Sequence, residues 1–558
     1  MIKIKIDLEK ILLALFFAFI LFVSLGSLFN HNIKHEFPFA YFASDAFQHQ
    51  VRAEAIKDMG NFKYEAAYIS KGIEGIEGRY PPVLYHLAVI LSHALGVETY
   101  DSILITVVFF AIIGSFIMYF IIKNFSKTAA LLSLPLSLII FSHPVSTGFL
   151  WGHWPSLLSQ SFLLLFFWAV MRLDLDKSFL IIAVVLSAIT LTHTSEAIFA
   201  MLFLALFFGI KLLAKKLSVR DIKIVAISIA LFFIISFYWL VIFQNTWAKS
   251  ETYNFVVQPI WDGNPGFYIA GFGFLLIPMI AGLIFSLPKL KQLHVSLILA
   301  FTMLIAGFLN YIGFGLRSFQ ARFFWPIYLS VFFGFGLYAL LKFIIRKWNF
   351  TYTAVIFIVF SLLFVGMVKF PIIKQTSYNV IPSIPYANVP TGPGIMNPLH
   401  WEALEWISKN TPEDSKAYFF YGDIYSQDAL LRNSKRFHAQ VVPDDFIDAI
   451  NKREIRRVYD TEFPGDSGGG IITRPSFFSF YNKENTLDED LFGKKDICQF
   501  DYYIFDKASR QEAFAQYNLL IANEMVTKNF IEPVFENQLI VILKNNNPGD
   551  DCIEERSF

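Results

Sequence analysis

A stretch between residues 41 and 56 places a carboxylate, an imidazole and a guanidinium within about two helical turns. Its sequence is YFASDAFQHQVRAEAI, and Asp45, His49 and Arg52 follow the spacing i, i+4, i+7. If the stretch is helical, the three side chains share one face. A carboxylate beside an imidazole could then take a proton from an incoming hydroxyl group. The alternative is an amphipathic helix that lies on a membrane surface with a solvated polar face.

Two turns between apolar segments carry further polar residues. The turn HPVSTGFLWGHWPS contains His143 and His153, and the turn THTSE contains His193 and Glu196. The flanking segments, as helices of about 16 residues, rise about 24 Å against a hydrocarbon layer of about 30 Å. Both turns are therefore expected below the membrane surface, in a cavity lined by protein. A carboxylate at that depth needs a partner, which favours a functional role for Glu196. The tryptophans of the first turn are instead typical of an interfacial aromatic belt.

Two arginines precede a late apolar segment in GFGLRSFQARFFWP, at Arg317 and Arg322. Arg322 is expected at the N-terminus of a helix over 323–345, where the helix dipole disfavours a cation. A helix N-terminus with an added arginine suits an anion such as a phosphate group. The alternative is pairing with the phosphate of a membrane headgroup.

Apolar segments long enough to cross a membrane must position these residues. The chain has 558 residues, 55% hydrophobic and 16% charged, against about 45–50% and about 25% in soluble proteins. We predict a mainly α-helical polytopic membrane protein, with about eleven spans and a short re-entrant or interfacial helix at 82–96. The spans are expected near 10–30, 102–122, 128–142, 155–171, 178–193, 197–213, 221–243, 267–287, 293–312, 323–345 and 351–371.

The distribution of charge predicts which side of the membrane each loop faces. With eleven spans and a cytoplasmic N-terminus, 17 lysines and arginines fall at cytoplasmic ends and three in the short outer loops, as the positive-inside rule requires. The first outer loop is then 31–101, and residues 372–558 are extracytoplasmic. The net charge is +10 over residues 1–371 and −9 over the rest. The net charge of the whole chain is only +1, which speaks against a large basic surface, so we expect no nucleic-acid partner.

A proline-rich linker over 372–398 separates the membrane domain, 1–371, from an α/β domain over 399–558. The latter is expected to contain a helix at 400–410, strands at 417–422 and 501–506, a helix near 510–528 and a hairpin through 531–544. Both cysteines, Cys498 and Cys552, fall in this domain. A disulfide between them on the oxidising side of the membrane and two unpaired thiols are the alternatives.

An acidic first-loop residue, a Tyr-Pro-Pro entry to a short apolar helix, arginines before a late helix and an exported domain form one pattern. This pattern resembles the GT-C superfamily of polytopic glycosyltransferases, especially prokaryotic and archaeal relatives of protein mannosyltransferases and oligosaccharyltransferase catalytic subunits. The matching segments are SDAFQHQ with Asp45 and His49, RYPP with Arg79 and Tyr80, Arg317 with Arg322, and LHWEALEWISKNTPEDSKAYFFYGD at 399–423.

The resemblance implies transfer of a sugar from a polyprenyl-phosphate-linked donor to a protein, glycan or lipid acceptor at the outer face of the cell membrane. In this interpretation Asp45, helped by His49, acts on the acceptor, and Arg317 and Arg322 bind the donor phosphate. The candidates for lining the cavity are Arg79, Tyr80, His143, His153, His193 and Glu196.

Some properties of the chain depart from this pattern. The second outer loop lacks the acidic pair of several GT-C families, so the participation of a divalent metal ion, Mg²⁺ or Mn²⁺, stays open. One alternative is a catalytically silent scaffold that binds a partner through the exported domain. Another is a transporter or lipid flippase, which the absence of an internal sequence repeat disfavours.

Overall fold

The computed structural model describes residues 7–69, 80–141, 147–173, 177–246, 273–308, 324–364, 396–420, 428–440, 497–508 and 512–552. Its contacts divide the chain into two compact units. The membrane unit comprises 1–33, 81–87 and 104–391, and the loop–sheet unit comprises 34–80, 88–103 and 392–558. The segments 34–80 and 88–103, which are most of the predicted first outer loop, thus group with the C-terminal part. The domain boundaries at 371 and 399, which were drawn from composition, stay a prediction.

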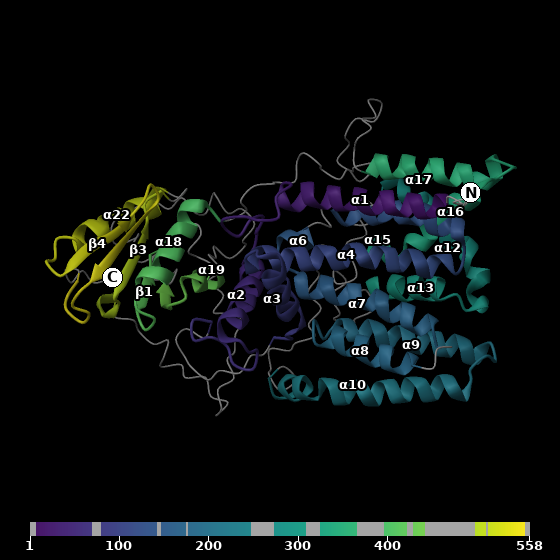
Figure 1. Ribbon diagram of the computed structural model, residues 1–558, viewed down its shortest axis with the longest axis horizontal. Coiled ribbons are helices and arrows are strands. Elements are labelled where there is room, and N and C mark those ends of the chain that lie inside the picture. Colours follow the sequence, from purple (N-terminus) through teal and green to yellow (C-terminus); the bar gives the residue numbers. More distant parts are fainter. Residues whose placement is uncertain are drawn as a thin grey trace, which may run out of the picture. The chain divides into compact units, whose positions relative to one another are not determined.

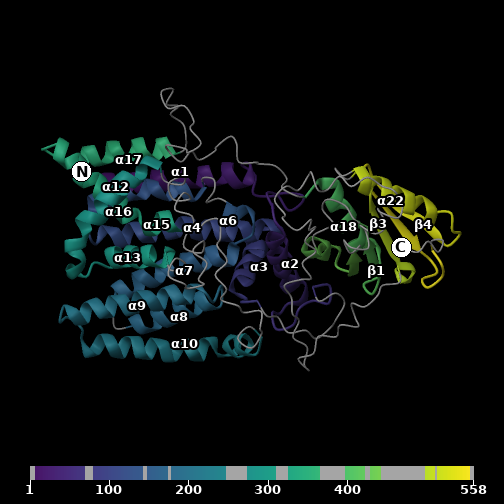
Figure 2. The same cartoon turned by 180° about the vertical axis from the view of Figure 1, so that it is seen from behind.

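Apolar helices make up the membrane unit, and α8, α9 and α10 lie side by side in both views (Figures 1 and 2). Five helices have the length and composition to cross a membrane, namely α1 (Leu8–Phe29), α4 (Thr99–Lys123), α7 (Trp154–Met171), α9 (Glu196–Leu213) and α10 (Val219–Thr246). The shorter helices include α3 (Val83–Leu95), α5 (Lys127–Ser133), α6 (Thr147–Leu150), α8 (Ser178–Thr190), α12 (Leu276–Ser286), α13 (Val295–Gly307), α15 (Trp325–Tyr328), α16 (Ser330–Ile344) and α17 (Phe350–Phe364). A mainly helical membrane protein is confirmed, whereas the count of eleven spans stays a prediction.

Two predicted spans are interrupted. The segment 128–142 begins as α5 and continues as a 3₁₀ helix, Leu134–Phe141, in which Pro135 lacks the N–H that an α-helix would use. The segment 323–345 is divided between α15 and α16 at Leu329, whose φ of −91° and ψ of 0° lie in the bridge region rather than the α region. The hydrophobicity of the sequence predicts that such segments are helical, but it does not predict where the backbone leaves the α-helical conformation.

Helix α7 is central in the membrane unit and α10 is peripheral. In its most apolar stretch, α7 is 78% buried, against 22% for α10. Apolar side chains of α10 are correspondingly exposed, with Ile234 at 71% and Phe237 at 67%. A continuous exposed apolar face of this kind suits contact with lipid.

Glycines let α16 approach its neighbours at backbone distance. A Cβ built on Gly336 would lie 1.9 Å from the carbonyl oxygen of Pro278, and one on Gly334 would lie 2.2 Å from that of Ala129. Small residues allow this kind of close packing between membrane helices. Helices α12 and α5 are therefore fixed against the two sides of α16.

At one end of the membrane unit, a buried carboxylate links three helices. Glu9 of α1 accepts from the ammonium groups of Lys123 and Lys127 at 2.6 Å each, and from the hydroxyl of Tyr119. These partners belong to α4 and α5, so Glu9 ties three helices together. The charge distribution predicts this end to be cytoplasmic.

A five-stranded mixed sheet forms the centre of the loop–sheet unit, with strand order β2-β1-β3-β5-β4. Strand β1 runs parallel to β2 and β3, and β5 runs antiparallel to β3 and β4. The strands are β1 (Lys416–Phe419), β2 (Phe437–Gln440), β3 (Tyr502–Asp506), β4 (Ile531–Glu536) and β5 (Ile540–Asn545). The helices of this unit include α2 (Ser44–Met59), α18 (Pro398–Asn410), α19 (Asp428–Leu431) and α22 (Glu512–Met525). The helix at 400–410 and the terminal hairpin are confirmed.

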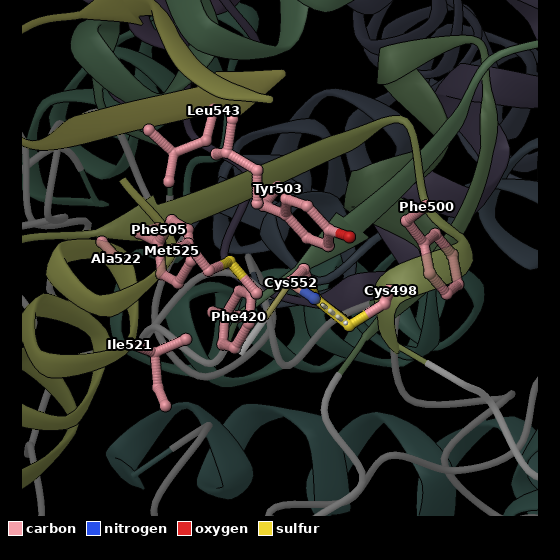
Figure 3. Packing of buried hydrophobic residues seen from close by; sticks show 11 residues of the cluster. Phe420, Cys498, Phe500, Tyr503, Phe505, Ile521, Ala522, Met525, Leu543 and Cys552 are labelled. Atoms are coloured by element: carbon pink, nitrogen blue, oxygen red, sulfur yellow. Dashed lines mark hydrogen bonds between the residues drawn. A yellow bond between two sulfur atoms is a disulfide. The ribbon is translucent and has the colours of Figure 1, made fainter. Parts of the chain in front are cut away.

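A disulfide joins Cys498 to Cys552 beside an aromatic core (Figure 3). Tyr503 and Phe505 of β3 belong to the same cluster as the two cysteines, and Phe420 stacks on Phe505 with ring centroids 4.1 Å apart. Of the two alternatives that the sequence left open, the structure contains the disulfide. It closes a loop with a sequence separation of 54 residues and holds the segment at Cys552 against the core beside the sheet.

Candidate functional site

Asp45 lies in the first turn of α2, and the helix that the 41–56 stretch predicted is present. The helix ends at Gly60, whose φ of +65° terminates it in the left-handed region. Asp45 is partly buried, and His49 is only 4% exposed. The carboxylate and the imidazole therefore share one helix face as expected, with the carboxylate near the positive end of the helix dipole.

Tyr80 packs against this face of α2. The His49 ring meets the Tyr80 ring edge-on with centroids 5.1 Å apart, and the guanidinium carbon of Arg52 lies 5.4 Å from the centre of the Tyr80 ring. Tyr80, predicted from the sequence as a cavity-lining residue, is thus half-buried against His49 and Arg52.

Arg52 has a structural partner. The side chains of Arg52 and Glu65 are 7% and 9% exposed, and they form an ion pair. The pair ties α2 to the segment that follows it in the first outer loop. The spacing in the sequence placed Arg52 on one helix face with Asp45 and His49. In the structure its guanidinium group forms an ion pair with Glu65.

A second set of ion pairs holds the other end of α2 to the C-terminal part of the loop–sheet unit. The Lys435 ammonium donates to Glu54 at 2.9 Å and to Asp58 at 2.7 Å. Thr99 donates to the second oxygen of Glu54 at 2.6 Å, and Tyr68 donates to Asp58 at 2.9 Å. Sequence reasoning missed Lys435, because 381 residues separate it from Glu54.

The ion pairs determine the protonation of both partners. Burial raises the pKa of the Glu54 carboxyl, but the Lys435 ammonium and the Thr99 hydroxyl outweigh burial and hold this pKa below its ordinary value of 4.5. Burial lowers the pKa of Lys435, but Glu54 and Asp58 outweigh it and raise this pKa above its ordinary 10.5. Both groups are therefore charged at neutral pH, and this tie holds the helix that carries Asp45.

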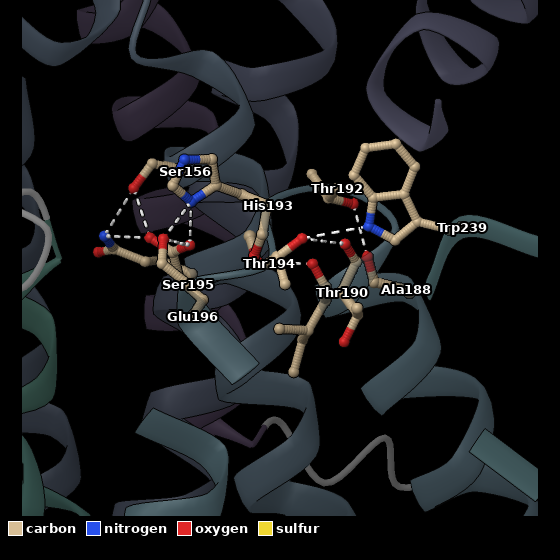
Figure 4. A network of polar contacts seen from close by, with 12 residues as sticks. Ser156, Ala188, Thr190, Thr192, His193, Thr194, Ser195, Glu196 and Trp239 are labelled. Carbon is tan, nitrogen blue, oxygen red and sulfur yellow. Dashed lines mark hydrogen bonds and ion pairs between the residues drawn. The ribbon is translucent and has the colours of Figure 1, made fainter. Parts of the chain in front are cut away.

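In the membrane unit, Glu196 is the first residue of α9 and is fully buried (Figure 4). Its carboxylate accepts from Ser156 at 2.6 Å and from the Gln160 amide at 3.5 Å, both on α7. It also pairs with the Nδ1 atom of His193 in the turn before α9. The α9 dipole favours a negative charge at this position, but no lysine or arginine in the described part of the chain contacts the carboxylate.

Among the residues that the structure describes, the contacts of the His193 imidazole are made through one nitrogen. Its Nδ1 faces Glu196 and lies 2.8 Å from the Ser195 hydroxyl, and 27% of the side chain is exposed. When Glu196 is ionised, Nδ1 carries a proton and Nε2 is left to exchange a proton or a hydrogen bond with another group. A carboxylate that fixes the tautomer of an imidazole is the arrangement found in proton-transfer dyads.

The turn that carries the dyad is anchored on both sides. Thr194 accepts from the Trp239 indole of α10 at 3.2 Å, and the hydroxyl of Thr192 donates to the carbonyl of Ala188 at 2.6 Å (Figure 4). His153, a cavity-lining candidate, precedes α7 and is half-buried, with its ring centroid 6.5 Å from that of Trp151. It belongs to the membrane unit, as the dyad does.

The remaining sequence candidates, Arg79, His143, Arg317 and Arg322, lie outside the described residues. The prediction that Arg317 and Arg322 act together with Asp45 therefore concerns residues that the structure does not describe. Among the described residues, no group of three or more histidines, cysteines, aspartates or glutamates could hold a metal ion. We therefore assign no metal ligands in this part of the chain.

Comparison with known proteins identifies the fold. No protein-family model and no curated protein matches the chain. The structure is similar to ArnT from Cupriavidus metallidurans bound to undecaprenyl phosphate, with a TM-score of 0.52 and 12% identity over 98% of this chain and 99% of that one. For apo ArnT the TM-score is 0.53, with 11% identity over 99% and 100% of the chains.

An archaeal structure is also similar. The apo oligosaccharyltransferase of Archaeoglobus fulgidus gives a TM-score of 0.49 and 13% identity, over 88% of this chain and 69% of that one. ArnT is a membrane glycosyltransferase of the GT-C superfamily. The similarity to the two ArnT structures confirms the predicted resemblance at the level of the fold alone.

Proposed function

We propose that this protein is a membrane glycosyltransferase that moves a sugar from a polyprenyl-phosphate-linked donor to an acceptor at the outer face of the membrane. The observation that carries the proposal is the similarity to ArnT over nearly the full length of both chains, in a structure that holds undecaprenyl phosphate. The two polar groups on α2 and at the α8–α9 turn supply residues suited to proton transfer.

In the proposed reaction, the acceptor hydroxyl oxygen attacks the anomeric carbon of the donor and inverts its configuration. The hydroxyl proton passes to Asp45, whose half-buried position on α2 and neighbouring His49 suit that role. The bond between the anomeric carbon and the phosphate oxygen breaks, and negative charge grows on the departing lipid phosphate. Arg317 and Arg322 would donate hydrogen bonds to this phosphate as its charge grows.

The His193–Glu196 dyad is proposed to border the same cavity. With Glu196 ionised and the imidazole doubly protonated, the dyad is neutral overall, and the Nε2 proton can be donated to an anionic oxygen. In the singly protonated state the same atom accepts a proton. We propose that the dyad helps the leaving phosphate through this atom. The proposed acceptor is a protein, a glycan or a lipid.

The test is an Asp45→Asn variant, assayed in nanodiscs for transfer from a panel of radiolabelled polyprenyl-phosphate hexoses. We expect the transfer rate to fall about 10²- to 10⁴-fold, as for loss of a general base. Glu36→Gln is the matched control, because it removes an exposed carboxylate from the same outer loop, and its rate should stay near that of the wild type. Transfer by Asp45→Asn at the wild-type rate would exclude the catalytic role of Asp45.

A further inference from the structure

The Glu196 carboxylate receives hydrogen bonds at both of its oxygens (Figure 4). Its Oε1 atom lies 2.6 Å from the Ser156 hydroxyl and 3.5 Å from the Gln160 amide nitrogen. Its Oε2 atom pairs with Nδ1 of His193 and accepts from the Ser195 hydroxyl at 3.3 Å. Because the carboxylate is fully buried, these side chains take the place of the water that would otherwise solvate its charge.

The two side chains at Oε1 belong to one helix, and the hydrogen bonds between them have a fixed direction. Ser156 and Gln160 are four residues apart on α7 and share a helix face. The Gln160 amide nitrogen lies 3.2 Å from the Ser156 oxygen, and this nitrogen can only donate. The serine oxygen therefore accepts from Gln160, and its single proton is left for Glu196.

Helix α7 is itself bonded to its neighbours at this level. The Ser159 hydroxyl donates to the carbonyl of Ile189, near the end of α8, at 3.1 Å. The main-chain carbonyl of Gln160 accepts from the Tyr328 hydroxyl of α15 at 3.2 Å. These bonds fix α7 against the α8–α9 turn on one side and against α15 on the other. The two donors on α7 are thus held in place beside the carboxylate.

We propose that Ser156 is a positioning residue that keeps Glu196 ionised and holds its Oε2 atom towards His193. Gln160 acts one step further away, because it directs the serine proton to the carboxylate. Neutral donors stabilise the charge without competing for it as a lysine or an arginine would. Among the residues that the structure describes, the imidazole is then the one basic group at the carboxylate. This role rests on the proposed function, since it affects sugar transfer only if the dyad takes part in the reaction.

Infrared spectroscopy tests the proposal without any sugar donor. Protonated and ionised carboxyl groups absorb at different frequencies, and the bands of Glu196 are isolated by subtracting the spectrum of the matching Glu196→Gln protein. The full-length protein is measured in nanodiscs across the pH range. We expect Glu196 to be ionised in the wild type at neutral pH. In Ser156→Ala, the ratio of protonated to ionised Glu196 at a given pH should rise about tenfold, the effect of losing one hydrogen bond to a charged group.

Matched variants separate a role at the carboxylate from a loss of packing. Ser156→Thr keeps a hydroxyl group and should keep the ratio of the wild type. Ser161→Ala should leave the ratio unchanged, because the buried hydroxyl of Ser161 on the same helix donates to the carbonyl of Leu157. An unchanged ratio in Ser156→Ala would overturn the proposal. A protonated Glu196 in the wild type at neutral pH would overturn it as well, whatever the folding of the Ser156 variants.

Sugar transfer is measured separately on the same samples. We expect kcat of Ser156→Ala to fall about tenfold with the KM for the donor within about twofold of the wild type, and Ser156→Thr to restore kcat. A raised infrared ratio in Ser156→Ala with an unchanged kcat would overturn the part of the dyad in the reaction, and Ser156 would still be the group that keeps Glu196 ionised. Absence of transfer by the wild type would overturn the proposed function, and the infrared ratio would still decide the role of Ser156 at the carboxylate.

Discussion

The carboxylates of the two units are neutralised in different ways. In the loop–sheet unit, Glu65 pairs with an arginine, and Glu54 and Asp58 pair with one lysine. In the membrane unit, the contacts of Glu196 within the described residues are hydroxyl groups, an amide and an imidazole. A carboxylate held by a strong cation stays ionised and serves to fix structure. A carboxylate whose basic partner is an imidazole lies beside a side chain that can act as a proton donor or acceptor.

Among the changes that test this comparison, we expect neutralising Glu196 in the membrane unit to have the largest effect. Glu196→Gln keeps the side-chain volume and hydrogen bonding but removes the charge that fixes the His193 imidazole. Transfer from the lipid-linked donor should fall about 10³-fold, because the imidazole loses the negative charge that stabilises its doubly protonated form, which donates the proton at Nε2. The measurement is kcat in nanodiscs at saturating donor.

Asp221→Asn is the matched control for Glu196→Gln. It removes a carboxylate of the same unit that does have a cationic partner, since Lys211 lies 2.6 Å away. We expect kcat per folded molecule to stay within about twofold of the wild type, in line with a structural ion pair. If the two variants lose activity equally, the distinction drawn between the two kinds of carboxylate is wrong.

Breaking the buried pair of the loop–sheet unit should instead lower stability. Arg52→Gln leaves Glu65 buried beside a neutral group, and we expect the free energy of unfolding to fall by about 3 kcal/mol. The double variant Arg52→Met with Glu65→Met should recover much of this loss, because it leaves no unpaired charge. Denaturant unfolding, followed by the fluorescence of the full-length protein, measures both. A double variant less stable than Arg52→Gln would contradict the assignment of a simple ion pair.

Lys435→Gln should produce a smaller loss, about 1–2 kcal/mol, because this side chain is 27% exposed and solvent screens its charge. The loss depends on pH. The lowered pKa of Glu54 means that its contribution is present above pH 4.5 and disappears as the pH falls below it. The raised pKa of Lys435 means that its contribution is present below pH 10.5 and disappears above it.

The stability difference between the wild type and Lys435→Gln should therefore be greatest between these two pH values and shrink on both sides. Thermal unfolding across the pH range measures it. A difference that does not change with pH would mean that Lys435 acts through packing rather than charge.

The smallest effect is expected at an exposed pair of the same unit. Lys409 and Glu405 lie one turn apart on α18 with their charged atoms 2.9 Å apart, and their side chains are 66% and 45% exposed. Glu405→Gln should change the free energy of unfolding by about 0.3–0.5 kcal/mol in the same unfolding assay. If Glu405→Gln lowered the free energy of unfolding as much as Lys435→Gln does, the distinction between buried and exposed ion pairs would be wrong.

Local patterns in the sequence predicted much of the fold and part of the candidate site. The spacing of Asp45 and His49 predicted a shared face if their stretch is helical, and α2 is that helix. The position of Glu196 in an apolar region predicted that its carboxylate needs a partner, and His193 is one of its partners. The partner of each charged group decides its role, and local sequence patterns did not predict these partners. Glu65 lies across a loop from Arg52, and Lys435 meets α2 only after the chain has folded.

Outward-facing edges of sheets are open to pairing with other chains, and β4 forms one edge of the sheet in the loop–sheet unit. This strand contains Pro533, which has no N–H to donate, and its register shifts between Pro533 and Phe535. Glu532 and Glu536 add negative charge along it. Because the missing N–H and the register shift interrupt the row of hydrogen-bonding groups along β4, this edge is a poor template for pairing with the sheet of a neighbouring copy.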